Sequence, residues 1–205
     1  MNIIYRDNDI ILIFKEAGLA VQSRNVMHKD AESLLLSELM QNGGTGKKPE
    51  LHVINRLDQP VEGLVLFALN KKAAAALTKQ LTDGNIEKIY RAQITGTIPA
   101  DEGTLTDYLQ KDGRSNTSRI VSKGTPNAKK ATLSYKKVSD DEIEIKLLTG
   151  RHHQIRVQLA HAGMPIRGDR KYGKSDPDYR GRLMLTACRL TFIHPSTGKK
   201  MDFCL

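Results

Sequence analysis

The sequence has few cysteines and lacks the long apolar segments that mark membrane and secreted proteins. Cys188 and Cys204 are its two cysteines, and they form neither a C-x-x-C pair nor a disulfide framework. No apolar run approaches the roughly twenty residues that cross a bilayer. The first seven residues lack the charged head and long apolar stretch of a signal peptide. We therefore expect a cytoplasmic protein that makes no membrane contact.

Metal-binding patterns are also missing from the sequence. The six histidines include no H-E-x-x-H motif and no other spacing typical of a metal site. The adjacent pair His152 and His153 suits packing and RNA contact better than metal ligation. We expect no metal.

Positive charge is in clear excess and lies mainly in the second half of the chain. The 205 residues include 32 Lys and Arg against 23 Asp and Glu, a net charge of +9. Residues 151–205 hold eleven basic and four acidic residues, whereas the first fifty hold six and seven. Basic side chains of this kind displace counterions from phosphate backbones. A second group of basic residues consists of Lys111, Arg114, Arg119, Lys123, Lys129, Lys130, Lys136 and Lys137. This distribution of charge favours a nucleic-acid partner over a merely solvated surface.

The hydrophobic pattern predicts a single α+β domain over residues 1–205, with a mixed, largely antiparallel sheet. Hydrophobic residues make up 39% and charged residues 27% of the chain, which is typical of a soluble globular protein. Helices are expected at 31–40, 71–81 and 155–162, the first two capped by Asp30 and Asn70. We expect a glycine- and lysine-rich loop at 42–49 and a loop carrying the basic cluster between 95 and 130. Strands are expected at 3–6, 10–15, 51–54, 63–69, 86–95, 130–138, 142–148 and 183–193.

Three segments are more polar than a plain fold requires. Asn55–Gly63 is a charged turn that leads into a buried strand and places Asp58 at the mouth of the sheet. Residues 87–92 put Lys88 and Tyr90 on one face of a strand. Thr149–Ala160 carries Arg156 near the start of a helix, where a cation is unfavourable unless a carboxylate lies beside it. Taken singly, Asp58 could cap a turn, Tyr90 could be a core aromatic and Arg156 could lie on the surface.

Together these segments resemble the signatures of the RluA-type pseudouridine synthases, within the wider RluA/RsuA superfamily. Arg56-Leu57-Asp58 with Gly63 resembles the motif of the catalytic aspartate, and Lys88–Ala92 resembles the tyrosine motif. Thr149-Gly150-Arg151 followed by His153-Gln154-Ile155-Arg156 resembles the arginine motif. Residues 182–198 resemble the closing strand, so the resemblance spans nearly the whole chain in the expected order. It implies the pseudouridine synthase fold with an active-site cleft.

The resemblance implies an isomerase that acts on uridines in rRNA or tRNA without a cofactor. Asp58 is the implied nucleophile, attacking either base or ribose, and Arg156 is its implied ionic partner. Tyr90 is expected against the uracil ring. The base would be flipped out of the RNA, which costs a few kcal/mol. Arg56 is implied to fill the space that the flipped base leaves, and Leu185 to pack on the uracil. The other implied substrate or RNA contacts are Arg151, His153, Gln154 and Lys88. The basic clusters at 111–137 and 167–189 would bind phosphates.

The sequence departs from the family pattern at three positions, where Asn55, Asn70 and Thr186 stand in place of the usual His, Lys and His. Many relatives carry an extra small RNA-binding domain, and we expect none in this protein. An alternative function is therefore a non-catalytic RNA-binding or RNA-folding factor on the same scaffold. A carboxylate-dependent hydrolase is less favoured, because Glu62 is the only acidic neighbour of Asp58 in sequence. We expect a monomer, and the modified uridine is left open.

Overall fold

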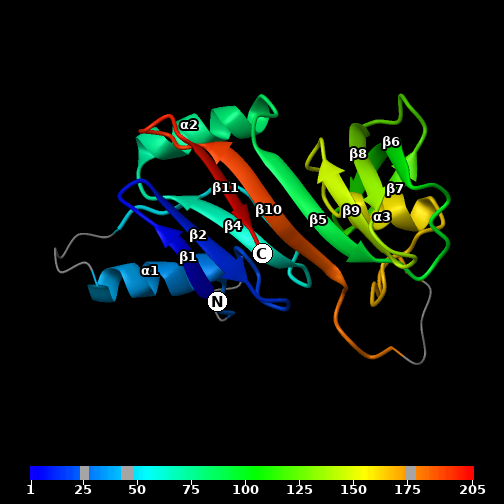
Figure 1. Ribbon diagram of the computed structural model, residues 1–205, viewed down its shortest axis with the longest axis horizontal. Helices are drawn as coiled ribbons and strands as arrows, with labels where there is room; N and C mark the ends of the chain where they lie inside the picture. The colour runs from blue at the N-terminus through cyan, green and yellow to red at the C-terminus, as the bar shows by residue number, and fades with distance from the viewer. Residues whose placement is uncertain (24–27, 43–48, 174–178) are drawn as a thin grey trace. The chain divides into compact units, whose positions relative to one another are not determined.

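The computed structural model describes residues 1–23, 28–42, 49–173 and 179–205 (Figure 1). The chain forms two compact units. Unit 1 contains residues 1–86 and 187–205, and unit 2 contains residues 87–186. Most of the predicted loop at 42–49 lies outside the described residues. Among the residues that are described, no helix is long and apolar enough to span a membrane.

Unit 1 is built on an antiparallel sheet in which β4 is fully buried and β2 is buried except at Phe14. β2 pairs with β4 in a register that sets Ile10 opposite Ala68 and Lys15 opposite Gly63. The strand order is β1-β2-β4-β10, with β3 also on β4 and β11 on β10. Because β2 and β4 are buried along both faces, they read as continuous apolar runs rather than alternating ones. The strands are β1 (Asn2–Arg6), β2 (Ile10–Lys15), β3 (His52–Val53), β4 (Glu62–Ala68), β10 (Leu185–Ile193, which begins in unit 2) and β11 (Lys200–Cys204).

Two helices belong to unit 1, and both begin at the predicted caps. α1 (Ala31–Asn42) starts after Asp30, whose carboxylate accepts the N–H of Ser33 at 2.8 Å. α2 (Lys71–Thr82) starts after Asn70, whose side-chain oxygen accepts the N–H of Ala73 at 2.8 Å. α2 packs against β3 and β4. Its apolar face joins one face of the sheet in a core made of Ile10, Leu12, Ile54, Leu64, Leu66, Ala68, Ala73, Leu77, Ile86, Leu190 and Phe192.

Unit 2 has a second antiparallel array in the order β5-β9-β8-β6-β7. Its helix α3 (Gln154–His161) lies against β6 and β7 (Figure 1). Val157 of α3 packs with Leu109 and Ala131 beneath Ile120 and Tyr172. The strands are β5 (Glu87–Gln93), β6 (Glu102–Asp112), β7 (Thr117–Val121), β8 (Lys129–Lys137) and β9 (Glu142–Leu147).

One prediction about this unit is wrong. The stretch between 95 and 130 is not a loop, because residues 102–121 form the β6–β7 hairpin, paired from Tyr108 with Val121 to Asp112 with Thr117. β6 places mainly Thr, Tyr and charged side chains on its faces, with Leu109 as its one fully buried residue, so its apolar alternation is weak. β6 is held in the sheet by its backbone pairing with β8 along Glu102–Leu109, which the sequence pattern does not reveal. The short strand β11 was also not predicted.

Candidate active site

Asp58 lies in the tight turn that leads into β4. Its backbone carbonyl accepts the N–H of Val61 at 3.0 Å, which closes the turn. Leu57 points into the core with 8% of its surface exposed, whereas Arg56 is exposed and Asp58 is partly buried. Leu57 thus anchors the turn in the core, while its neighbours Arg56 and Asp58 remain accessible to solvent.

A buried lysine, which the sequence analysis missed, holds this turn from below. Lys15 ends β2 with no exposed surface, and its ammonium donates to the carbonyls of Leu19 at 2.7 Å and Gln59 at 3.2 Å. It also donates to the carbonyl of Glu16 at 3.0 Å. Burial lowers the pKa of Lys15 to about 8, and the negative charge of Asp58 partly opposes that shift. The ammonium of Lys15 therefore interacts electrostatically with the carboxylate of Asp58. The available signal was a lysine directly after the apolar run Ile10–Phe14.

The two residues that flank this turn fix β4 in the sheet. Gly63 has a φ of +125°, and a Cβ there would lie 2.3 Å from the carbonyl oxygen of Ala187, so only glycine fits. Asn55 is buried, accepts the N–H of Leu66 at 2.7 Å and donates to the carbonyl of Leu64 at 3.2 Å. The departure from the family at Asn55 therefore has a structural role in this chain.

In unit 2, the tyrosine and arginine motifs lie side by side. Tyr90 is 6% exposed on β5, where it pairs with Ile145 of β9. Lys88 extends toward the arginine-motif loop, because a Cβ built on Gly150 would lie 3.8 Å from its Nζ. Burial lowers the pKa of Lys88. Lys88 thus lies near the arginine motif, and its predicted contact with substrate or RNA stays a prediction.

Gln154 organises the loop before α3. Its side-chain oxygen accepts from the Thr149 hydroxyl at 2.8 Å and from the N–H of Arg151 at 3.0 Å. Its amide nitrogen donates to the carbonyl of Thr132 at 3.1 Å. These bonds explain why Gln154 is buried, and an RNA contact by Gln154 stays a prediction. Arg151 is exposed and is directed by a 3.0 Å bond from its Nε to the carbonyl of Lys130.

Arg156 is a buried cation with an acidic partner that the sequence analysis did not assign. Its Nε and Nη2 donate to the two carboxylate oxygens of Asp169 at 2.8 and 2.7 Å, and each residue is 4% exposed. Burial alone would raise the pKa of Asp169, but the Arg156 bonds and two backbone N–H groups outweigh it and lower that pKa. The guanidinium carbon also lies 5.2 Å from the ring centre of Tyr172. The expected interaction of Arg156 with Asp58 stays a prediction.

His153 precedes α3 in a strained backbone conformation. Its φ of 52° is left-handed, and its ring stacks on His152 with the centroids 3.8 Å apart. Its Nδ1 is hydrogen-bonded to the Tyr172 hydroxyl at 2.7 Å. Burial and the nearby charge of Arg156 lower the pKa of His153 to about 4, so it is neutral at pH 7. The predicted residue Leu185 is 2% exposed at the start of β10.

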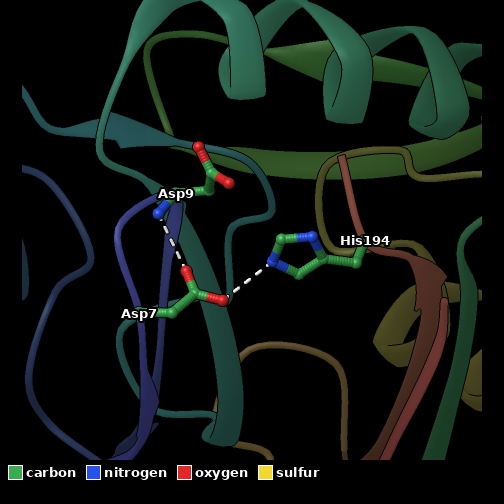
Figure 2. A group of neighbouring side chains, drawn as sticks. All are labelled: Asp7, Asp9 and His194. Carbon is green, nitrogen blue, oxygen red and sulfur yellow. Dashed lines mark hydrogen bonds and ion pairs between the residues drawn. The ribbon is translucent and has the colours of Figure 1, made fainter. Parts of the chain in front are cut away.

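A cluster of Asp7, Asp9 and His194, which the sequence analysis also missed, joins the β1–β2 turn to the turn before β11. Figure 2 shows the imidazole of His194 directed at Asp7, and the Nε2–Oδ2 distance is 2.8 Å. Asp7, Asp9 and His194 present oxygen and nitrogen atoms within 4.8 Å of one another, a spacing that suits a metal ion. However, His194 Nδ1 accepts from the N–H of Thr197 at 3.2 Å, which puts the ring proton of a neutral imidazole on Nε2. Asp7 also accepts the N–H of Ile10 at 2.9 Å. These bonds account for the cluster as a structural link between the two turns.

Comparison with known proteins assigns the chain to a family. Residues 9–161 match the model of the RNA pseudouridylate synthases, a range that includes Asp58, Tyr90 and Arg156. The chain belongs to this family, as its motifs predicted. It is 32% identical to the dual-specificity RNA pseudouridine synthase RluA of Vibrio vulnificus (strain CMCP6), over 95% of this chain and 78% of that protein.

A second relative is the ribosomal large subunit pseudouridine synthase C of Buchnera aphidicola subsp. Schizaphis graminum (strain Sg), at 31% identity. That similarity covers 98% of this chain and 65% of the relative, so the chain spans about two thirds of its length.

Solved structures confirm the predicted fold. Human RNA pseudouridylate synthase domain containing 1 superimposes with a TM-score of 0.77 at 25% identity, over all of this chain and 82% of that one. Human RNA pseudouridylate synthase domain containing 4 gives a TM-score of 0.79 at 20% identity and covers all of this chain and 87% of that one. The α+β pseudouridine synthase fold is therefore established for this chain.

Proposed function

We propose that this protein is an RNA pseudouridine synthase that isomerises specific uridines with Asp58 as its nucleophile. The observation that carries the proposal is the family match over residues 9–161, which includes all three motifs that bear the proposed catalytic residues. The reaction breaks the N1–C1′ bond of uridine and forms a C5–C1′ bond, while C5 loses a proton and N1 gains one. It has no net redox change, and so we propose that the enzyme needs neither cofactor nor metal.

Asp58 must be ionised to act, and its surroundings favour the carboxylate. The ammonium of Lys15 is buried, interacts with the Asp58 carboxylate and donates to the carbonyl of Gln59 in the same turn. In our proposal Arg156 contributes a second positive charge when the target base is bound. The bidentate bond to Asp169 fixes the guanidinium in one orientation. Two cations of fixed position would keep the carboxylate reactive even though a bound base excludes water.

Tyr90 and Leu185 are proposed to hold the detached uracil between them. Tyr90 offers an aromatic face and a hydroxyl that can help to remove the C5 proton. Arg56 is exposed beside Asp58, where it is able to enter the space left by a flipped base. Arg151 and the exposed lysines of β8 suit phosphate contacts. We further propose a cytoplasmic monomer that acts on ribosomal or transfer RNA.

The test is pseudouridine formation in vitro. Purified protein is incubated with total RNA from a strain that lacks its gene, with chelator present, and new pseudouridines are mapped. Large-subunit ribosomal RNA is the first RNA to examine, given the relative that bears that name. We expect sites with wild type and with the control Asp140→Asn, which changes an exposed acid, and none with Asp58→Asn.

The alternative of a non-catalytic RNA-binding factor makes the opposite prediction. Wild type would bind the RNA without forming pseudouridine in any folded substrate. Free uracil among the products would instead indicate a hydrolase. Either result would overturn the proposed function.

A further inference from the structure

The β6–β7 hairpin is fastened to the start of α3 by side-chain hydrogen bonds. The hydroxyl of Ser118 on β7 donates to the carbonyl of His152 at 2.8 Å and is bonded to its Nδ1 at 2.9 Å. Asn116, in the hairpin turn, accepts from His152 Nε2 at 3.1 Å. The side-chain ammonium of Lys171 donates to the Asn116 carbonyl at 2.9 Å. The hairpin and the arginine motif are thus one hydrogen-bonded assembly.

Tyr172 lies at the centre of this assembly and contacts both sides of it. Its hydroxyl accepts the backbone N–H of Ser118 at 2.7 Å and is bonded to His153 Nδ1 at the same distance. Its ring lies under the Arg156 guanidinium, at 5.2 Å from the guanidinium carbon. Its own N–H donates to Asp169 at 3.2 Å, the acid that holds Arg156. One residue therefore connects the hairpin, the helix start and the Arg156–Asp169 pair.

The turn end of the same hairpin also carries exposed positive charge. Lys111 lies just before the turn and Arg114 lies within it, and both are exposed. Arg119 on β7 is exposed and is held by two bonds to the side-chain oxygen of Gln110, at 3.1 and 2.8 Å. Ser118, next to Arg119, is buried, so adjacent residues of β7 carry the exposed charge and the contact with the arginine motif. A phosphate backbone that binds these cations would contact the hairpin directly. It could therefore shift β7, which Tyr172 links to the start of α3 by hydrogen bonds.

We propose that Tyr172 is a positioning residue for Arg156, and that its hydroxyl couples RNA docking on the β6–β7 hairpin to the orientation of that guanidinium. The proposal rests on the proposed function, because it concerns the arginine of the same site. Tyr172 need not touch the substrate in this role. It transmits the position of the hairpin through Ser118, and its ring contacts the guanidinium whose Nε and Nη2 are bound by Asp169.

The first experiment compares Tyr172→Phe with Tyr135→Phe. The second variant removes a hydroxyl from the same array, at a buried ring packed on Gly103 rather than on the arginine motif. Single-turnover rates of pseudouridine formation and RNA dissociation constants are measured with each enzyme. We expect Tyr172→Phe to lower the rate by about tenfold or more, since small misplacements of a reacting group are costly. Its RNA affinity should change by less than about twofold, because no phosphate contact is lost. Equal rates for the two variants would overturn the proposal.

Coupling is tested with a double-mutant cycle that adds Arg114→Ala. In a wild-type background this change should weaken RNA binding and also lower the single-turnover rate at saturating enzyme. In the Tyr172→Phe background it should weaken binding alone, so that the rate effects are not additive. Additive rate effects would refute the coupling. A wild-type enzyme that forms no pseudouridine would instead refute the proposed function and leave no rate to compare.

A second pair of variants covers the case in which Tyr172→Phe does not fold. Lys171→Gln removes the bond from an exposed lysine to the Asn116 carbonyl of the hairpin, and Arg170→Gln removes one positive charge from the adjacent exposed residue. We expect the larger loss of rate with Lys171→Gln. Equal losses would mean that only charge matters, and the proposal would fall.

Discussion

Replacing Asp169 with asparagine should strongly destabilise unit 2, because it leaves a buried guanidinium without its counter-charge. Arg156 and Asp169 are each 4% exposed and share two hydrogen bonds. Breaking a buried ion pair by removing one partner costs about 3–5 kcal/mol. Asparagine keeps an oxygen that can accept the N–H groups of Lys171 and Tyr172, which favours the lower end of that range. In a chain of this size about 3 kcal/mol lowers Tm by roughly 6–12 °C.

The assay is thermal unfolding followed by circular dichroism at pH 7, with pseudouridine formation measured below the transition. The double variant Arg156→Met with Asp169→Asn removes the buried cation as well, and so it should recover much of the lost Tm. It should nevertheless remain inactive, because stability and the proposed chemistry make separate demands on Arg156. A single variant Asp169→Asn that loses less than about 1 kcal/mol would refute this account of the buried pair. So would a double variant whose loss equals the sum of the two single losses.

Three further predictions concern single residues. Lys15→Met should lower the rate of pseudouridine formation by about tenfold or more, because Asp58 loses a neighbouring cation. It should also lower the free energy of unfolding, measured with denaturant, by on the order of 3 kcal/mol, because three carbonyls lose their hydrogen-bond donor. Gly63→Ala should reduce soluble yield and Tm sharply, because its Cβ would lie 2.3 Å from the oxygen of Ala187; an unchanged Tm would contradict the geometry. The pKa of His153 is about 4 in the folded protein, against 6.5 for an ordinary histidine. Between these pH values the unfolded chain binds a proton that the folded protein does not, so the free energy of unfolding should fall by on the order of 3 kcal/mol as the pH drops from about 6.5 to 4. His153→Asn, which tolerates the left-handed backbone, should flatten the dependence of Tm on pH in that window.

Much of the fold could be predicted because its main elements have strong local signals. The buried strands β2 and β4 are continuous apolar runs, and α1 and α2 begin at capping side chains that accept backbone N–H groups. β6 and β7 could not be found in this way. Their stability comes from pairing with β8 and from Ser118 contacts that join residues far apart in sequence. The alternation of apolar and polar residues reports burial on one face of a strand, and β6 buries little.

The candidate site was predicted by motif, but the residues that support it were not. Asp58, Tyr90 and Arg156 stand in recognisable patterns. Lys15 and Asp169 do not, since each acquires its role only when the chain brings it to a buried partner. A lone lysine after a strand and an aspartate in a polar loop are common on protein surfaces, and only burial distinguishes these two from such cases.

The departures from the family pattern are weaker evidence for a non-catalytic protein than the sequence alone suggests. The side chain of Asn55 closes hydrogen bonds to two backbone groups of β4, directly before the turn that carries Asp58. Asn70 caps α2 and donates to Asp9 at 2.8 Å, which ties the helix start to the β1–β2 turn. Two of the three departures, Asn55 and Asn70, thus have structural roles in this chain, and so they do not by themselves indicate a loss of catalysis.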